Sequence, residues 1–384
     1  MTMQPTAADL ESLIALRHDL HRHPELSGHE AATAGRIVAA LEGSGAHIVT
    51  GLGGNGVAAV FDSGLPGPSV MFRAELDALP IHETGTLPWG STVDGKGHLC
   101  GHDGHMAILA GLGLGLARRG PARGKVVLLF QPAEETGAGA RAVIQDPRFT
   151  DLICDWAFAL HNMPGIEHGA AWLAPGPANC ASLGLVMQFE GKTSHASVPE
   201  AGVSPAPALA RLMPALVALG PGGPLEPGYR LATVTHARLG ERALGIAPGW
   251  AELLVTLRAL DDAGLEALLR EARTIAEAEA CAAGLAFQCH VEDHFAACAN
   301  HPEATAHLAG ALDACGVVHE TGTLPMRASE DFGLFGSVSK SAMVFLGAGR
   351  KHAMLHNPDY DFPDDLIAPG VAIFGHLTER ICGR

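Results

Sequence analysis

Short apolar runs alternate with helical patterns over most of this chain, and this alternation restricts the possible folds more than any other feature. The apolar runs are VAAVF near residue 57, SVMFRAEL near 69, KVVLLF at 125–130 and WAFAL at 156–160. Helical patterns include one with leucines at 10, 13, 16 and 20, one from about 103 to 118, and one after 135. Strands that alternate with helices favour a mostly parallel sheet covered by helices, so the sequence predicts an α/β fold.

The pattern changes near residue 182. One strand, one helix, two strands, one helix and one strand follow one another up to about residue 293. This βαββαβ order is typical of a split ferredoxin-like unit. From about residue 294 the first pattern returns, with a helix near 302–315, the strand VFLGAG and a closing helix near 365–381. We therefore predict a discontinuous domain formed by residues 1–181 and 294–384, with residues 182–293 inserted as a second domain.

Charge and hydropathy restrict the partners. The formal net charge is −16 and the basic residues are scattered, which argues against a nucleic-acid or anionic-membrane surface and favours a small-molecule partner. No stretch approaches the roughly 18 to 20 apolar residues of a membrane-spanning helix, and no signal peptide is recognised, so a cytoplasmic location is expected. Of the eight cysteines, all but Cys100 are expected to be buried thiols.

Several side chains that can bind metal ions follow predicted strands. Glu134 and Glu135 come after KVVLLF, His161 after WAFAL, and Asp77 lies at the end of SVMFRAEL. In an open α/β sheet, ligands bind beyond the carboxyl ends of the strands. These side chains are therefore expected to lie near one another.

A thiol and an imidazole, Cys100 and His102, lie in a glycine-flanked loop that leads into a helix, and His356 follows near the C-terminus. Each feature has an ordinary explanation: a single histidine among 21 is usually structural, adjacent glutamates often begin a helix, and Asp103 alone would be a helix N-cap. Taken together, the four segments favour a metal site.

The chain resembles, nearly end to end, the amidohydrolase branch of the di-metal peptidases. This branch includes hippurate hydrolases, N-acyl-amino-acid amidohydrolases and plant indole-acetyl-amino-acid hydrolases, which are relatives of aminoacylase and the glutamate carboxypeptidases. The matching segments are LRHDLHRHPELSGHE (16–30), FRAELDALPIHE (72–83), GHLCGHDGHMAILAG (97–111), FQPAEETGAGA (130–140), ALHNMPG (159–165), SHASVP (194–199), ASEDFG (328–333) and LHNPDYDFPDD (355–365).

The resemblance implies two divalent ions per subunit, roughly 3.5 to 4 Å apart. The implied ligands are Cys100, His102, Glu135, His161 and His356. Glu134 would be the general base for a metal-activated water. Asp77 and His105 would orient the ligands or serve only in packing. A thiolate favours zinc, while imidazole and carboxylate would also hold manganese, cobalt or nickel.

For the inserted domain, the resemblance implies a lid that forms a homodimer and supplies His195 to stabilise an oxyanion, in the same subunit or its partner. Arg258 would meet a substrate carboxylate, or would be a solvated strand residue. Four departures from the family pattern leave the acyl and amine parts of the substrate undefined: Thr193 and Ser194 for Gly-Gly, Glu200 for His, Gly245 for Asn, and Glu75 for Asp.

The expected function is therefore metal-dependent hydrolysis of the amide bond of N-acyl amino acids or similar small amides. A deaminase or dipeptidase using the same centre, and a non-catalytic relative that binds a metal or ligand, are the alternatives. The presence of Glu134 argues against the non-catalytic alternative.

Overall fold

The computed structural model describes residues 3–383 and divides them into two compact units. Unit 1 comprises the described residues up to Ala178, Cys298–Leu324 and the described residues from Asp331 onward. Unit 2 comprises Asn179–Ala297 and Pro325–Glu330. Residues 325–330, which the sequence pattern assigned to the first domain, pack within unit 2, where Asn179 forms a parallel bridge with Met326.

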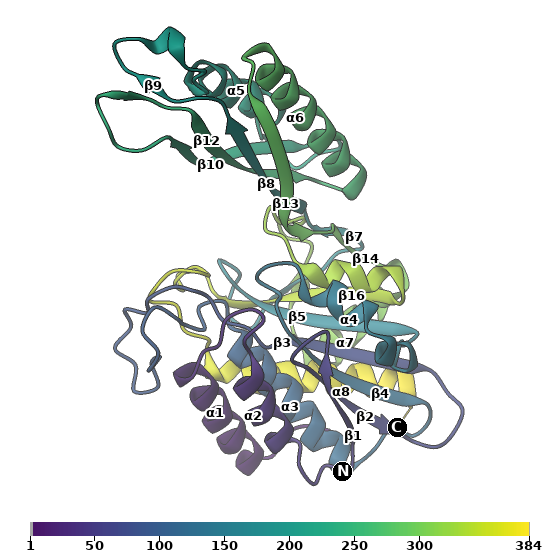
Figure 1. Ribbon diagram of the computed structural model, residues 1–384. Coiled ribbons are helices and arrows are strands. Elements are labelled where there is room, and N and C mark those ends of the chain that lie inside the picture. The colour runs from purple at the N-terminus through teal and green to yellow at the C-terminus, as the bar shows by residue number, and fades with distance from the viewer. Residues whose placement is uncertain (1–2, 384) are drawn as a thin grey trace. The chain divides into compact units, whose positions relative to one another are not determined.

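An eight-stranded mixed sheet forms the centre of unit 1 (Figure 1). Its neighbouring strands are, in order, β1 (His47–Leu52), β2 (Gly56–Asp62), β4 (Lys125–Gln131), β3 (Ser69–Glu75), β5 (Trp156–Pro164), β16 (Lys340–Gly349), β6 (Ala171–Trp172) and β15 (His319–Glu320). The four central strands, β4, β3, β5 and β16, are parallel to one another, whereas β1, β2 and β6 pair antiparallel with their inner neighbours. This mixed sheet confirms the predicted α/β class.

Helices cover one face of this sheet, and shorter elements cover the other. The helices of the first face are α1 (Ala7–Arg22), α2 (Ala31–Ala40), α3 (His102–Arg118), α7 (Pro302–Cys315) and α8 (Ile367–Cys382). The second face carries α4 (Gly139–Gln145) and 3-10 turns at Pro147–Leu152 and Asp331–Ser337; a further turn, Asp364–Leu366, leads into α8. The central strands are buried on both faces, which explains why their sequences are continuous apolar runs.

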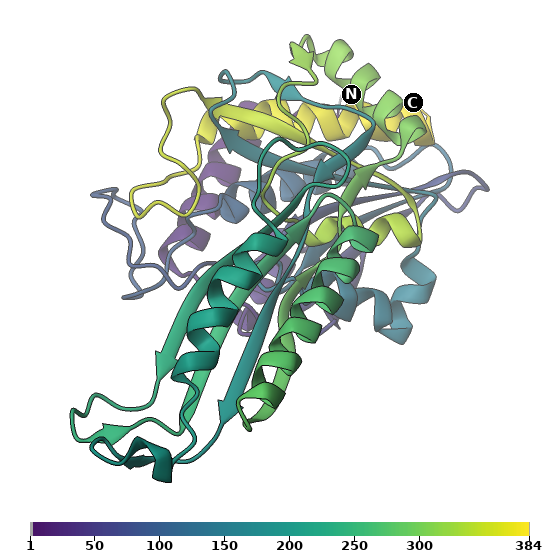
Figure 2. The same cartoon turned by 90° about the horizontal axis from the view of Figure 1, so that it is seen from above.

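Unit 2 contains a four-stranded antiparallel sheet in the order β10 (Arg230–Leu239), β12 (Trp250–Ala259), β8 (Ala181–Glu190) and β13 (Ala286–Phe295). Helices α5 (Ala206–Leu219) and α6 (Asp262–Ala282) pack on one face of it, as Figure 2 shows. In chain order these elements run βαββαβ. At one end of the unit, β9 (Ser194–His195) pairs with β11 (Ile246–Ala247), and the short strands β7 (Gly176–Asn179) and β14 (Cys298–Asn300) pair where the chain passes between the units.

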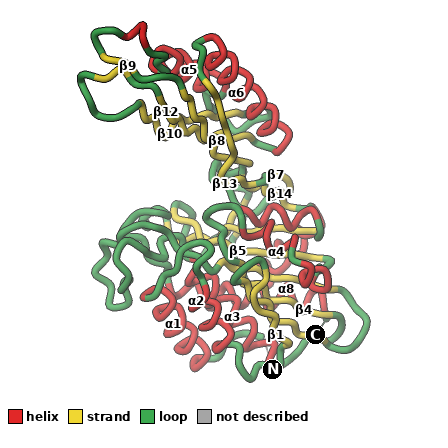
Figure 3. The backbone as a smooth tube through the Cα atoms, in the orientation of Figure 1, coloured by secondary structure: helices red, strands yellow, loops and turns green. Residues whose placement is uncertain are grey.

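Local details differ from the sequence-based expectations. Helix α3 begins at His102 after Gly101, which takes the left-handed conformation with φ of 91° and occupies the N-cap position, so Asp103 lies inside the helix and does not cap it. Among the cysteines expected to be buried, Cys281 is exposed and Cys289 and Cys315 are partly exposed. The long connection between β3 and α3 is loop (Figure 3). None of the described helices has the length and apolar character needed to cross a membrane.

Candidate metal centre

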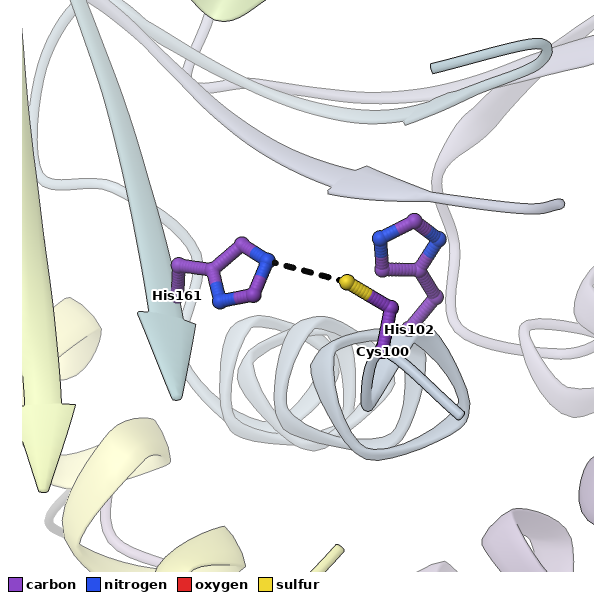
Figure 4. A group of neighbouring side chains, drawn as sticks. All are labelled: Cys100, His102 and His161. Carbon is purple, nitrogen blue, oxygen red and sulfur yellow. Dashed lines mark hydrogen bonds between the residues drawn. The ribbon is translucent and has the colours of Figure 1, made fainter. Parts of the chain in front are cut away.

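The structure brings the five predicted ligands together in unit 1. Cys100 precedes α3, His102 is its first residue, Glu135 follows β4, His161 lies in β5, and His356 lies in the loop between β16 and α8. Their donor atoms form two groups that share the Cys100 thiol. One group is Cys100, His102 and His161 (Figure 4), and the other is Cys100, Glu135 and His356. Within each group, all donor atoms lie within 4.8 Å of one another.

Glu135 lies between two imidazoles. Its Oε1 is 3.8 Å from Nε2 of His102, and its Oε2 is 3.6 Å from Nε2 of His356. The Cys100 thiol donates to Nε2 of His161, with 3.6 Å between sulfur and nitrogen. A carboxylate with one oxygen toward each of two imidazoles, beside a thiol shared by both groups, suits a pair of neighbouring cations.

Hydrogen bonds fix the orientation of two of the rings. His102 donates from Nδ1 to the backbone carbonyl of Asp77 at 2.8 Å, and His161 donates from Nδ1 to the carbonyl of Asn162 at 2.7 Å. Because a carbonyl only accepts, each Nδ1 carries a proton, and in the neutral form of the ring the lone pair is on Nε2. Nε2 of His102 is buried and has no hydrogen-bond partner among the described residues. Metal-binding histidines show this arrangement.

The electrostatics of these groups also fit a cation. Burial, together with Glu135 and Glu134, raises the pKa of the Cys100 thiol well above its usual value. Burial and the neighbouring His105 lower the pKa of His161 to about 3, so this ring is neutral. For His102, burial alone would lower the pKa, but the carboxylates of Glu75 and Glu135 raise it. A divalent ion would offset the negative carboxylates and release the thiol proton. The residues therefore fit the group that the resemblance implies.

Glu134 lies next to this cluster and is nearly fully buried. Its Oε2 is 4.0 Å from Nε2 of His102, and its backbone carbonyl accepts a hydrogen bond from Gly137 at 2.7 Å. The side chains of two adjacent residues on a tight turn leave the backbone in different directions, so both carboxylates cannot easily bind the same ion. The turn therefore allows Glu135 to bind a cation and Glu134 to accept a proton nearby.

Asp77 contacts two of the ligand segments. Besides the carbonyl that holds His102, its carboxylate accepts from the backbone N–H of Glu135 at 3.0 Å and from the hydroxyl of Ser27 at 2.7 Å. This buried side chain therefore ties the loop after β4 to the start of α3.

His105 contacts Glu75, one of the positions that depart from the family pattern. It donates from Nδ1 to the Glu75 carboxylate at 2.7 Å, and its Nε2 lies 2.6 Å from the side-chain oxygen Oδ1 of Asn162. Burial alone would raise the pKa of Glu75, but Arg73 and His105 hold it well below its usual value. Glu75 thus forms part of a buried ionic network with Arg73 on the same strand.

Sequence reasoning missed a second buried network, centred on Arg17 of α1. Arg17 is fully buried and bonds Asp103 at 2.9 Å, Asp364 at 3.3 Å, and Asp361. Asp103 also accepts from Nδ1 of His21 at 2.8 Å. Because Asp103 follows His102 and the two distant aspartates follow His356, Arg17 joins two ligand-bearing segments. A signal was available, since an arginine that shares a helix face with Leu13 and Leu20 must be buried with a counter-charge.

His195 and Arg258 belong to unit 2. His195 is exposed, and its Nδ1 accepts from the backbone N–H of Ser197 at 3.1 Å, which leaves the ring proton on Nε2. Arg258 is partly buried and donates from Nη1 to Ser329 at 2.6 Å and to the carbonyl of Arg327. Burial lowers the pKa of Arg258, and no carboxylate of the described chain pairs with it.

Comparison with known proteins gives consistent relatives. The chain is 30% identical to hippurate hydrolase of Campylobacter jejuni over 381 residues, which cover 98% of this chain and 99% of the relative. It is 33% identical to an N-acetylcysteine deacetylase of Bacillus subtilis over 275 residues, 71% of each chain. The solved structure of a dinuclear metal binding peptidase of Bacillus subtilis matches with a TM-score of 0.82 and 26% identity, over 98% of this chain and 99% of that one. The family model of peptidase family M20/M25/M40 matches residues 71–380, and this chain therefore belongs to that family.

Proposed function

We propose that this chain is an amidohydrolase that uses two divalent metal ions to cleave the amide bond of N-acyl amino acids or similar small amides. The observation that carries the proposal is the convergence of Cys100, His102, Glu135, His161 and His356 around a buried Glu134. The hydrolases among the relatives support the same reaction class. Zinc or manganese fits this donor set best, and cobalt or nickel would also fit.

Metal ions in such a centre polarise the scissile carbonyl and lower the pKa of a water molecule. Glu134 then acts as general base: its carboxylate takes a proton from the attacking water and returns it to the leaving amine. Asp77 and His105 act on the reaction only through the ligands and backbone that they hold.

His195 is the proposed oxyanion donor of unit 2. Its Nε2 bears the proton because Nδ1 accepts from Ser197, so the exposed edge of the ring is a hydrogen-bond donor. A donor of this kind stabilises the charge that develops on the carbonyl oxygen. Arg258 would bind the carboxylate of an N-acyl amino acid, because its Nε and Nη2 groups form no hydrogen bond with described side chains.

Unit 2 would serve as a lid and as the dimer interface. Its outer strand β10 pairs with β12 on one side, and on the other side the start of the strand, residues 230–232, bonds the backbone of residues 220–222. The rest of this outer edge could pair with the same strand of a second copy. A homodimer in light scattering would support this assembly, and a monomer at all concentrations would contradict it.

The test is a screen of N-acyl amino acids, dipeptides and aromatic amines, with and without chelator, on wild type and Glu134→Gln. We expect hydrolysis of N-acyl amino acids, loss of activity with chelator, recovery on return of the metal, and a drop in kcat of up to about 10⁴-fold in the variant. Metal analysis should still find two ions in Glu134→Gln. Turnover restricted to dipeptides or to deamination would replace the proposed substrate. Two bound ions with no turnover of any compound would favour a binding protein.

A further inference from the structure

The residue before Glu134 has an unusual backbone conformation. Ala133 has φ of 50°, in the left-handed region that residues with a side chain rarely occupy. Among the described residues other than glycine, positive φ occurs only at Ala133, Asp293 and His356. Two of these three positions therefore lie in the candidate centre. Such a conformation persists only where surrounding contacts hold it.

The contact that holds Ala133 comes from a distant carboxylate. Oε1 of Glu30 accepts from the backbone N–H of Ala133 at 2.9 Å and from that of Gly28 at 2.8 Å, while Oε2 accepts from Nδ2 of Asn55 at 2.8 Å. Glu30 is fully buried, and no cationic side chain of the described chain pairs with it. Its charge is thus balanced by neutral N–H groups alone, one of which belongs to the residue that precedes Glu134.

The other side of Glu134 is held in the same way. The backbone N–H of Glu135 donates to the buried Asp77 carboxylate at 3.0 Å, and Ser27 donates to the same oxygen. Residues 27–30 therefore contact the backbone on both sides of Glu134. Glu30 bonds the N–H of Ala133 directly, and Ser27 bonds the Asp77 carboxylate that accepts from the N–H of Glu135. The carbonyl of Ala133 is also fixed, since it accepts from the N–H of Gly139 at 3.0 Å.

We propose that Glu30 is a positioning residue that sets the backbone of Ala133 and thereby aims the Glu134 carboxylate. This inference rests on the proposed role of Glu134 as general base. Glu30 does not itself contact Glu134, so it acts through the peptide that it holds. A misplacement of about 1 Å at a catalytic group can lower the rate by about 100-fold.

Two variants separate the position of the Glu30 oxygens from their charge. Glu30→Asp keeps the charge but withdraws the oxygens from the Ala133 N–H by one methylene. Glu30→Gln keeps the length and one oxygen for Ala133 and Gly28, and its NH2 group can donate to Asn55 once that amide turns its oxygen inward. Glu25→Asp is the matched control, because Glu25 accepts from the backbone N–H of Thr33 at 2.7 Å at the start of α2 and does not contact the loop after β4.

We expect Glu30→Asp to lower kcat by about 10- to 100-fold with KM within about 3-fold and two ions still bound. Glu30→Gln and Glu25→Asp should keep kcat within about 3-fold of wild type. A larger loss of kcat in Glu30→Gln than in Glu30→Asp would show that the charge of Glu30 matters more than the position of its oxygens, and would overturn the inference. So would an unchanged kcat in Glu30→Asp, or an equal loss in Glu25→Asp.

Hydrogen exchange provides a readout that does not depend on activity. The peptide covering residues 132–139 should exchange faster in Glu30→Asp than in wild type, and at the wild-type rate in Glu25→Asp. If wild type hydrolyses none of the tested amides, the proposed function fails, yet this exchange still tests whether Glu30 holds the loop. Unchanged exchange in Glu30→Asp would reject the positioning role by itself.

Discussion

The metal-binding part of the machinery and the part that should meet the substrate are built differently. In unit 1, His102 and His161 are buried, and backbone carbonyls fix the tautomer of each ring. In unit 2, His195 is exposed on the two-residue strand β9, and its ring bonds the hydroxyl and the backbone N–H of Ser197, two residues away. The metal centre is thus held by segments from across unit 1, whereas His195 is held locally.

This contrast explains where the departures from the family pattern gather. Thr193, Ser194, Glu200 and Gly245 all lie close to the β9–β11 pair, at exposed or partly exposed positions. A side chain there can change without leaving a buried polar group unsatisfied. Glu75 is the one departure within unit 1, and Arg73 and His105 bond its carboxylate. On the proposed function, substrate preference could therefore change in unit 2 while the proposed metal ligands of unit 1 are kept.

The largest effect on stability should come from breaking the buried network of unit 1. Arg17→Met leaves Asp103 and its partners without their buried counter-charge, and we expect a loss of about 3 to 5 kcal/mol in the free energy of unfolding. Arg36→Met on the neighbouring helix α2 is the control, since Arg36 pairs with Asp19 at a partly exposed site and should cost less than about 1 kcal/mol. Urea unfolding measures both. Equal losses of unfolding free energy in the two variants would show that the buried ion pairs of Arg17 stabilise the fold no more than the partly exposed pair of Arg36 does.

Sequence patterns were sufficient for the elements and ligands that are encoded locally. Strands β3, β4 and β5 are continuous apolar runs, and the proposed metal ligands lie in motifs that can be recognised without a structure. The two-residue strands β6 and β15 are too short to show any periodicity. The sequence did not reveal the residues that hold the candidate metal centre in place, because Arg17 lies 347 residues from its partner Asp364 and Glu30 lies 103 residues from Ala133. Such pairings depend on the folded chain and leave no local pattern.

A second test examines whether the exposed His195 is as important as the buried ligands. His195→Ala should lower kcat by about 100- to 1,000-fold, because one oxyanion donor is removed, with the bound metal unchanged. His290→Ala, at an exposed position on β13 in the same unit, is the control and should have little effect. A kcat within about 3-fold of wild type in His195→Ala would show that His195 does not stabilise the oxyanion.

Metal removal should affect the two units unequally. A ligand present at 100 times its dissociation constant stabilises the state that binds it by about 2.7 kcal/mol, so return of the ions should protect unit 1 by about this amount. Hydrogen exchange should slow in α3 on metal addition and stay unchanged in α6, which belongs to the core of unit 2. Equal protection of both helices would mean that the units do not respond separately.

The smallest expected effect is a pH dependence within the Arg17 network. Burial alone would lower the pKa of His21, but its contacts with Asp103 and with Glu83, 3.4 Å away, raise it above the usual value. The folded state therefore binds this proton more tightly than the unfolded chain does. The resulting stability is fully present below about pH 6.5 and is lost as the pH rises through the higher pKa of the folded state. In metal-free protein, the stability lost in His21→Gln should be larger at pH 6 than at pH 8.5, by about 1 kcal/mol for each unit by which the pKa is raised. Urea unfolding at the two pH values measures this difference, and a larger loss at pH 8.5 would mean that His21 is held as the neutral ring.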